Sequence, residues 1–214
     1  MKAHYLHDWQ VTPARAVMIQ RELAGRISTE DGCLDVKLVA GVDISVSRLG
    51  GMGRGAVVVL RYPELNLVES QVAEWEIDFP YVPGLLSFRE APVLLAACEK
   101  LSSTPDLILV DGQGWAHPRR LGLASHLGLL WDKPTIGCAK SRLCGEHDPV
   151  GIGRGEFSRL TDRGEIIGVV LRTKTNVKPL YISPGHKISL ESSIQWALNC
   201  GRGYRLPEPT RSLF

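Results

Sequence analysis

The chain has 214 residues, of which 44% are hydrophobic and 22% are charged. This length and balance predict one globular domain over residues 1–214 with a sizeable apolar core. No stretch reaches about 18 uninterrupted apolar residues, and the first ten residues lack an apolar signal-peptide centre, so we expect neither a membrane span nor secretion. Five cysteines without a CxxC pair argue against a disulfide framework or a zinc knuckle and favour the reducing cytoplasm.

The formal net charge of +2 is distributed unevenly along the chain. Residues 1–139 hold 13 Lys and Arg against 16 Asp and Glu, whereas residues 140–214 hold 12 against 7, which gives −3 and +5. A carboxylate-rich part beside a cationic part suits a metal site next to a polyanion. An ordinary solvated surface explains the same counts, so charge alone leaves both interpretations open.

The first half of the chain predicts a helix followed by a meander of strands. Thr12 and Pro13 are typical of a helix start, and an amphipathic helix is expected over 14–24, with Val17, Ile19, Leu23 and Ala24 buried. A strand over 36–46 carries Asp43 inside its apolar run. We interpret residues 50–55 as a tight glycine-rich connection to two further strands, 56–62 and 67–77.

The second half alternates helices and short strands. Residues 79–86 are too proline-rich for a helix or a ladder, and Ser87 with Glu90 three residues later has the spacing of a capping box for a helix to about residue 101. Further elements are predicted as follows: strand 106–111, helix 118–130, strand 135–138, a hairpin turning at 162–164 with its second strand at 165–172, an extended segment 180–183 and a helix 190–198. This order indicates an α/β fold of the ribonuclease H-like kind, a mixed five-stranded sheet flanked by helices with extra strands and helices C-terminal.

Three carboxylates occupy distinctive places: Asp43 within a strand, Glu90 in the first turn of a helix, and Asp111 at the end of a short apolar strand. Buried carboxylates are costly unless they are paired or coordinated, so a bound cation explains Asp43 most simply. Oxygen ligands favour Mg²⁺ or Mn²⁺, and a metal shared by Asp43 and Asp111 would suit phosphodiester hydrolysis.

Each of these residues also has a purely structural interpretation. Asp43 can accept hydrogen bonds from a turn, Glu90 can cap its helix, and Asp111 can start a turn. His117 can be a core histidine and Lys140 a solvated lysine. The structural interpretation weakens when all five residues are considered together, because one fold would bring them to one place.

Six segments of the chain resemble the endonuclease V (deoxyinosine 3′-endonuclease) family. They are residues 41–43, 80–90, 111–119, 122–128, 135–140 and 183–189. The resemblance spans nearly the whole chain, and the segments 80–90 and 111–128 are highly specific.

This resemblance implies a Mg²⁺-dependent enzyme of DNA repair, with Mn²⁺ as a substitute, that acts on DNA containing deoxyinosine or other deaminated bases. We also expect a monomer, although the sequence leaves the oligomeric state open. It implies a nick at the second phosphodiester bond 3′ to the lesion. The implied roles by position are: metal ligands Asp43, Glu90 and Asp111; a lesion wedge of Pro80, Tyr81, Val82 and Pro83; and a base pocket of Gly84, Leu86, Gly112 and Gly122. A stiff loop around an exposed aromatic independently fits a wedge that stacks on a base.

The remaining expected site residues are cationic or titratable. His117 and Lys140 would join the carboxylates as catalytic residues near the scissile phosphate. Phosphate contacts are expected from Arg119, Arg142 and His186, with Arg120, Arg172 and Lys174 as further candidates. Cys144 and the tail after Gly201 receive no role.

Three alternatives stay open on sequence. An endoribonuclease acting on inosine in RNA would use the same base-reading motifs. A non-catalytic nucleic-acid-binding module would be expected to lack one of the three carboxylates, and a metal-independent scaffold would need neither a buried Asp43 nor a stiff wedge.

Overall fold

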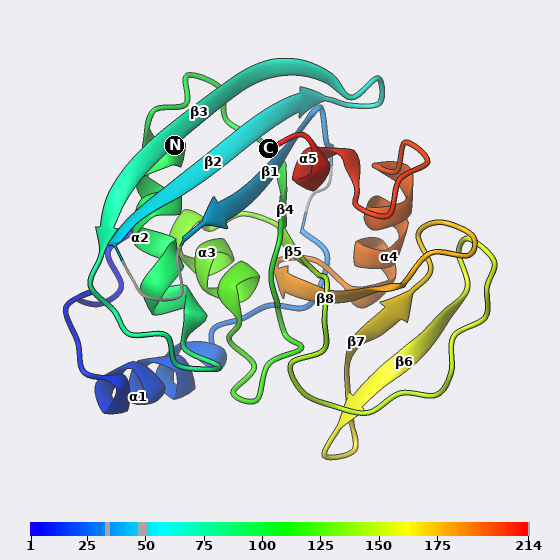
Figure 1. Ribbon diagram of the computed structural model, residues 1–214. Coiled ribbons are helices and arrows are strands. Elements are labelled where there is room, and N and C mark those ends of the chain that lie inside the picture. Colours follow the sequence, from blue (N-terminus) through cyan, green and yellow to red (C-terminus); the bar gives the residue numbers. More distant parts are fainter. Residues whose placement is uncertain (33–34, 47–50, 214) are drawn as a thin grey trace.

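A computed structural model describes residues 1–32, 35–46 and 51–213. Its strands form one mixed sheet in the order β3-β2-β1-β4-β5-β8-β7-β6 (Figure 1). The strands are β1 (Leu38–Ser45), β2 (Gly51–Arg61), β3 (Asn66–Ile77), β4 (Leu107–Val110), β5 (Thr135–Ala139), β6 (Phe157–Asp162), β7 (Glu165–Leu171) and β8 (Leu180–His186). The helices are α1 (Pro13–Ala24), α2 (Leu86–Glu99), α3 (Leu123–Trp131), α4 (Leu190–Asn199) and α5 (Glu208–Arg211).

Strands β3, β2, β1, β4 and β5 form the five-stranded core that the sequence predicts. β1, β2 and β3 are antiparallel neighbours, whereas β4 runs parallel to β1 and β5 runs parallel to β4. The C-terminal strands β8, β7 and β6 extend the same sheet in antiparallel fashion. The predicted mixed sheet flanked by helices is therefore confirmed, and its parallel centre places the carboxyl ends of β1, β4 and β5 side by side.

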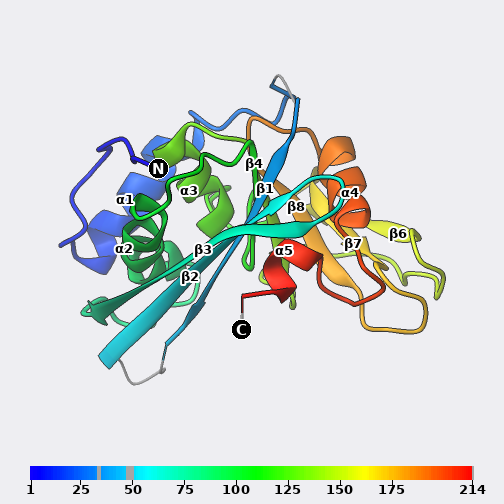
Figure 2. The same cartoon turned by 90° about the horizontal axis from the view of Figure 1, so that it is seen from above.

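Helices cover both faces of this sheet because its central strands are apolar on both sides. All four residues of β4 are buried. Helices α2 and α3 pack on one face, over Val42, Val57 and Ile108, and α4 packs on the other, over Leu109 and Ile182. Figure 2 shows α1, α2 and α3 on one side of the sheet and α4 and α5 on the other. No helix among the described residues combines the length and the apolar character that a membrane crossing requires.

Two expectations, one about residues 50–55 and one about Ser87, are wrong. Residues 51–55 are not a tight connection but the start of β2, where Gly53 pairs with Trp75 and Gly55 with Ala73 (Gly50 lies outside the described residues). Glycine is needed there because a Cβ on Gly55 would meet the Val93 backbone of α2 at 3.0 Å. Ser87 is not a helix cap either: α2 starts one residue earlier, and the Ser87 hydroxyl donates to His126 Nδ1 (3.1 Å) instead.

The predicted helix 118–130 starts late, at Leu123. Arg120 adopts φ +57°, a left-handed conformation that ends any helical run before it. Its guanidinium pairs with Asp162 (2.9 Å) and Glu165 (2.7 Å) of the β6–β7 hairpin, which holds residues 118–122 as a turn. Two C-terminal elements also exceed expectation: β8 continues to His186, and α5 occupies part of the tail that had no assignment.

Candidate active site

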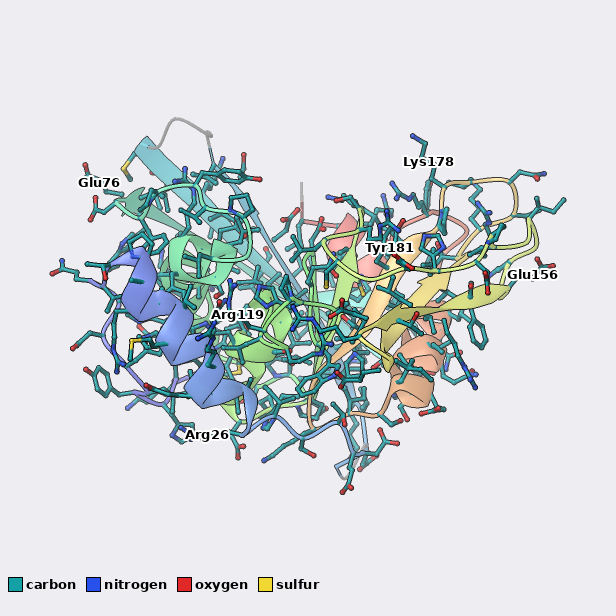
Figure 3. All side chains as sticks on the ribbon, turned by 90° about the horizontal axis from the view of Figure 1, so that it is seen from below. Arg26, Glu76, Arg119, Glu156, Lys178 and Tyr181 are labelled. Carbon is teal, nitrogen blue, oxygen red and sulfur yellow. The ribbon has the colours of Figure 1, made fainter. Side chains whose placement is uncertain are left out.

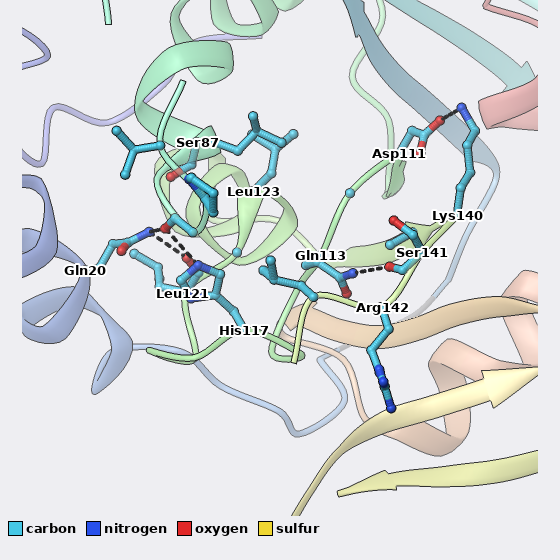
Figure 4. Close-up of a pocket in the computed structure, with 18 of the residues that line it drawn as sticks. Gln20, Ser87, Asp111, Gln113, His117, Leu121, Leu123, Lys140, Ser141 and Arg142 are labelled. Carbon is cyan, nitrogen blue, oxygen red and sulfur yellow. Dashed lines mark hydrogen bonds and ion pairs between the residues drawn. The ribbon is translucent and has the colours of Figure 1, made fainter. Parts of the chain in front are cut away.

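A cavity of about 340 Å³ opens at the carboxyl ends of β4 and β5 (Figure 4). Its volume is in the usual range for a small-molecule site. Segments distant in sequence meet there. The lining includes Gln20, Tyr81, Val82, Pro83, Gly84, Leu86, Asp111, Gly112, Gln113, His117, Gly122, Lys140 and Arg142. The cavity therefore joins the proline-rich loop to the carboxylate at the end of β4.

Asp43 and Asp111 are neighbours because β1 and β4 run parallel in register. Val42 pairs with Val110, and the Asp111 N–H donates to the Val42 carbonyl (3.1 Å), so the two aspartates follow at the same level. The Lys140 ammonium, which comes from the end of β5, lies 3.9 Å from Asp43 Oδ2 and contacts Asp111 Oδ2 directly. Three adjacent strands thus deliver two carboxylates and one cation to the same point.

Glu90 reaches this point from α2 and is buried, with 7% of its surface exposed. Burial, together with the charge of Asp43, raises the pKa of Glu90 to about 8. Burial and the charge of Asp111 likewise raise the pKa of Asp43 to about 6. The three carboxylates therefore carry more negative charge than this partly desolvated place stabilises, and a cation would relieve it.

The donor set fits a hard divalent cation. Among the described residues no three His, Cys, Asp or Glu side chains already stand close enough to enclose a metal, and a lysine ammonium supplies positive charge between Asp43 and Asp111. That lysine side chain is 49% exposed, so it has room to move aside. Carboxylate oxygens are the ligands that Mg²⁺ and Mn²⁺ prefer, and these ions bind with only one or two carboxylates plus water and substrate phosphate.

The expected wedge is an exposed loop with one anchored residue. Pro80, Tyr81 and Pro83 are exposed, whereas Val82 packs partly into a cluster that contains Leu85 and Phe88. Tyr81, Val82 and Pro83 line the cavity, but Pro80 lies on a different hollow of the surface. The prolines restrict the loop backbone, so Tyr81 is presented at the cavity mouth with little freedom to lose.

The expected base-pocket residues Gly84, Leu86, Gly112 and Gly122 all line the cavity. Gly122 must be glycine, since a Cβ there would lie 2.3 Å from the Gln113 carbonyl oxygen. Gly84 adopts φ +80°, which glycine reaches without strain. At these three glycines the cavity wall is therefore main chain.

His117 lines the cavity, but its hydrogen bonds favour a structural role over the expected catalytic one. Its ring is buried, Nε2 donates to the Gly84 carbonyl (2.9 Å), and Nδ1 accepts from the Arg119 N–H (3.1 Å). Burial, with the nearby charges of Arg119 and Arg120, lowers the pKa of His117 to about 4, so the ring is neutral at pH 7. Both ring nitrogens are occupied by main-chain groups, which leaves neither of them to act on a phosphate.

His186 lies away from the carboxylates, and its contacts do not support the expected phosphate contact. It pairs with Thr135 at the start of β5, whereas Lys140 follows the end of that strand, so about 15 Å of strand separates them. There His186 accepts a hydrogen bond from the Ser28 N–H (3.2 Å) and lies 3.6 Å from Asp132. The motif over residues 183–189 contains no information about the end of β8 at which the His186 side chain lies.

The expected phosphate-binding arginines divide into two groups. Arg142 is exposed at the cavity rim and remains suitable. Arg119 lies beside α1 (Figure 3), where its guanidinium donates to Gln20 and Gly84. Arg120 is paired with the hairpin acids described above, and Arg172 donates to the carbonyls of Val150, Gly151 and Val177, so both serve the fold. Lys174 lies at the surface over the ring of Tyr204 (5.8 Å).

Gln113 and Gln20 also line the cavity, although the sequence predicted no role for either. Gln113 donates to the Ser141 carbonyl (2.8 Å) and links the loop after β4 to the loop after β5. Gln20 is buried in α1, with 1% exposed. Its position four residues after Ala16 and three before Leu23 places it on the apolar face of α1, and that spacing was the available signal.

Comparison with known proteins identifies the family of this chain. The family model described as Endonuclease V matches residues 21–212. An endonuclease V from Dehalococcoides mccartyi strain BAV1 is 56% identical over 211 residues, which cover 99% of this chain and 95% of that protein.

Two solved structures show the same fold. The endonuclease V of Bacillus subtilis superposes with a TM-score of 0.93 at 31% identity, covering 100% of this chain and 94% of that one. The endonuclease V of Ciona intestinalis, solved in complex with a 24mer DNA containing an inosine followed by a ribo-adenosine, superposes at 0.80 with 29% identity, covering 94% and 93% of the two chains. Since the family model spans most of the chain and a relative more than half identical spans nearly all of it, the protein belongs to the endonuclease V family of nucleases.

Proposed function

We propose that the protein is a Mg²⁺-dependent endonuclease that recognises deaminated bases in DNA, chiefly hypoxanthine, and nicks at the second phosphodiester bond 3′ to the lesion. The main observation behind this proposal is that Tyr81, Val82 and Pro83 of the wedge loop line the same cavity as Asp111 and Lys140. If a base is held in that cavity, the DNA strand that carries it would lie beside the carboxylates of Asp43, Glu90 and Asp111. The inosine-containing DNA bound by the Ciona relative supports the substrate.

In this proposal Tyr81 parts the lesion from its neighbours and stacks on exposed base surface, while the extruded base enters the cavity. The start of α2 lines the cavity at Leu86 and Ser87, and this helix has no side-chain cap. Its first N–H groups are then available to a base carbonyl such as that of hypoxanthine. The main-chain wall at Gly84, Gly112 and Gly122 suits close contact with a flat ring.

Asp43, Glu90 and Asp111 would hold Mg²⁺, with Mn²⁺ as a substitute. When bound, such an ion activates water and neutralises charge on the departing oxygen. Lys140 would shift from the carboxylates to the scissile phosphate and stabilise its negative charge, and Arg142 would hold the flanking backbone. His117 has no part in the chemistry and His186 none in phosphate binding.

We further propose that the protein works in the cytoplasm as a monomer. The cysteines that the structure describes carry no disulfide, and Cys98, Cys138 and Cys200 are buried thiols, as a reducing compartment permits.

The test is a nicking assay on matched duplex DNA, single-stranded DNA and RNA oligonucleotides that each carry one inosine, with the break mapped. We expect cleavage of both DNA substrates at the second bond 3′ to inosine, loss of cleavage in EDTA, and recovery with Mg²⁺ or Mn²⁺ but poorly with Ca²⁺. Asp43→Asn and Asp111→Asn should abolish nicking while leaving inosine-DNA binding largely intact. Retained nicking by either variant in Mg²⁺ would refute the metal assignment, and cleavage of the RNA alone would replace the DNA substrate with RNA.

A further inference from the structure

The carbonyl oxygen of Gly84, at the junction of wedge and cavity, accepts three side-chain hydrogen bonds. The donors are Gln20 Nε2 (2.9 Å), His117 Nε2 (2.9 Å) and Arg119 Nη2 (2.7 Å). A carbonyl oxygen has two lone pairs, so three convergent donors, one of them cationic, are more than its ordinary complement. This convergence restrains one peptide group far more than the rest of the wedge loop.

The three donor residues are also hydrogen-bonded to one another. Arg119 Nε donates to Gln20 Oε1 (2.5 Å), and the Arg119 main-chain N–H donates to His117 Nδ1 (3.1 Å). Gln20 Nε2 further donates to the Leu121 carbonyl (3.2 Å). Because these carbonyls only accept and the guanidinium only donates, the orientation of the Gln20 amide and the tautomer of His117 follow from the contacts.

The restrained peptide is the one that joins recognition loop to helix. Its N–H, that of Leu85, donates to the Val82 carbonyl (2.9 Å), and α2 begins at the next residue. Gly84 at φ +80° would otherwise have a wide choice of conformation. Rotation of this peptide would move Pro83 and Tyr81 relative to Leu86, and hence the wedge relative to the cavity.

We propose that Gln20, His117 and Arg119 form a clamp on the Gly84 carbonyl that sets how strongly the enzyme discriminates a deaminated base from a normal one. These are positioning residues: they fix where the wedge stands over the cavity and do not touch the reacting atoms. The inference rests on the proposed function for its substrate. It assigns a role in recognition to a glutamine in α1 and to an arginine and a histidine expected to serve phosphate chemistry.

Two substitutions at the buried Gln20 separate the clamp from simpler roles. Gln20→Met keeps the length and volume but loses every hydrogen bond, whereas Gln20→Glu keeps an acceptor for Arg119 but sets a carboxylate oxygen against the Gly84 carbonyl. A packing role alone predicts that Gln20→Met behaves as wild type. If Gln20 serves only to hold Arg119, Gln20→Glu should behave as wild type. The clamp predicts that both variants discriminate inosine poorly, because both lose the hydrogen-bond donor to the Gly84 carbonyl.

The measurement is the ratio of dissociation constants for undamaged and inosine-containing duplexes of one sequence, in EDTA so that no cleavage occurs. We expect this ratio to fall about tenfold in both variants, the effect of one buried hydrogen bond, with affinity for undamaged duplex unchanged. Glu22→Gln, an exposed change on the same helix, is the matched control and should bind as wild type.

A wild-type ratio in either folded Gln20 variant would overturn the clamp, even if the wild-type enzyme discriminates inosine as proposed. A wild-type enzyme that does not discriminate would overturn the proposed function and the clamp with it. If thermal melts show that the Gln20 variants do not fold, Arg119→Met at its half-buried position decides on the same ratio: a fall supports the clamp and no change refutes it.

Discussion

Gly137 on β5 offers a sharp test of how the loop after β4 is positioned, because it bears no functional group. A Cβ there would lie 2.4 Å from Gly114 N, 2.8 Å from Gly112 O and 2.9 Å from Gln113 C. All three are backbone atoms, and ordinary contacts are about 3.5–4.0 Å. In Gly137→Ala the loop must therefore retreat from β5 by about 1 Å, and Asp111 begins that loop.

The expected costs follow from this displacement. Overpacking of this kind destabilises by about 1–3 kcal/mol, which lowers Tm by roughly 2–12 °C in a protein of this size. A reacting group misplaced by about 1 Å costs on the order of 100-fold in rate, so we expect single-turnover nicking of inosine DNA to fall by about that factor.

The assay pairs calorimetric Tm with single-turnover nicking at saturating Mg²⁺. Gly25→Ala is the matched control, since a Cβ there meets nothing within 4 Å and the backbone is right-handed helical at φ −67°. It should raise stability by about 0.4–1 kcal/mol and leave nicking unchanged. A Gly137→Ala enzyme with wild-type rate and Tm would refute the claim that direct backbone packing positions this loop.

Three further predictions concern the carboxylates and the wedge. In EDTA, Glu90→Gln should raise Tm at pH 8.5 and far less at pH 5. The pKa of Glu90 is about 8 in the folded protein against 4.5 in the unfolded chain, so the free-energy penalty of ionising it builds up as pH rises between those values, on the order of 5 kcal/mol in full. A variant less stable than wild type at both pH values would contradict this. Mg²⁺ binding should release protons and strengthen between pH 6 and 8, because the ion competes with protons on Asp43 and Glu90; calorimetry in buffers of different ionisation enthalpy measures the release, and its absence would exclude these ligands. Tyr81→Ala should change stability by less than about 0.5 kcal/mol, since the side chain is 52% exposed, yet weaken binding of inosine DNA by about 1–3 kcal/mol. An equal loss on undamaged duplex would remove the wedge role.

Local signals predicted the parts of the site that depend on strand order. Short apolar runs ending in a carboxylate are characteristic of central strands, so the adjacency of Asp43 and Asp111 followed once β1 and β4 were recognised as neighbours. The glycines at 84, 112 and 122 came instead from the resemblance to endonuclease V, which implies a base pocket lined by backbone.

The hydrogen-bond partners of individual side chains were harder to predict, because these partners are distant in sequence. His117 and Arg119 carry ring and guanidinium groups that fit a phosphate, yet both turn toward Gly84, a residue 33 and 35 positions away. Gln20 was missed for the same reason, since its main partner is 64 positions distant. The late start of α3 likewise depends on hairpin acids more than 40 residues downstream of Arg120.

Under the proposed function, the buried carboxylates and the glycine loop would let one element of the chain serve both recognition and cleavage. Asp111 faces Lys140 and Asp43, and the next residue, Gly112, lines the cavity. Consecutive Cα atoms are about 3.8 Å apart, so the backbone that carries the Asp111 carboxylate and the backbone that forms the pocket wall move together. Gly114 fixes the far end of the loop, because its backbone lies so close to that of Pro184 that a Cβ would approach within 2.2 Å of the carbonyl oxygen. A rigid link between the cavity and the carboxylates should give the same nick position for every base that enters the cavity, whatever its chemistry. Different lesions should then differ in binding affinity and not in the bond that is broken.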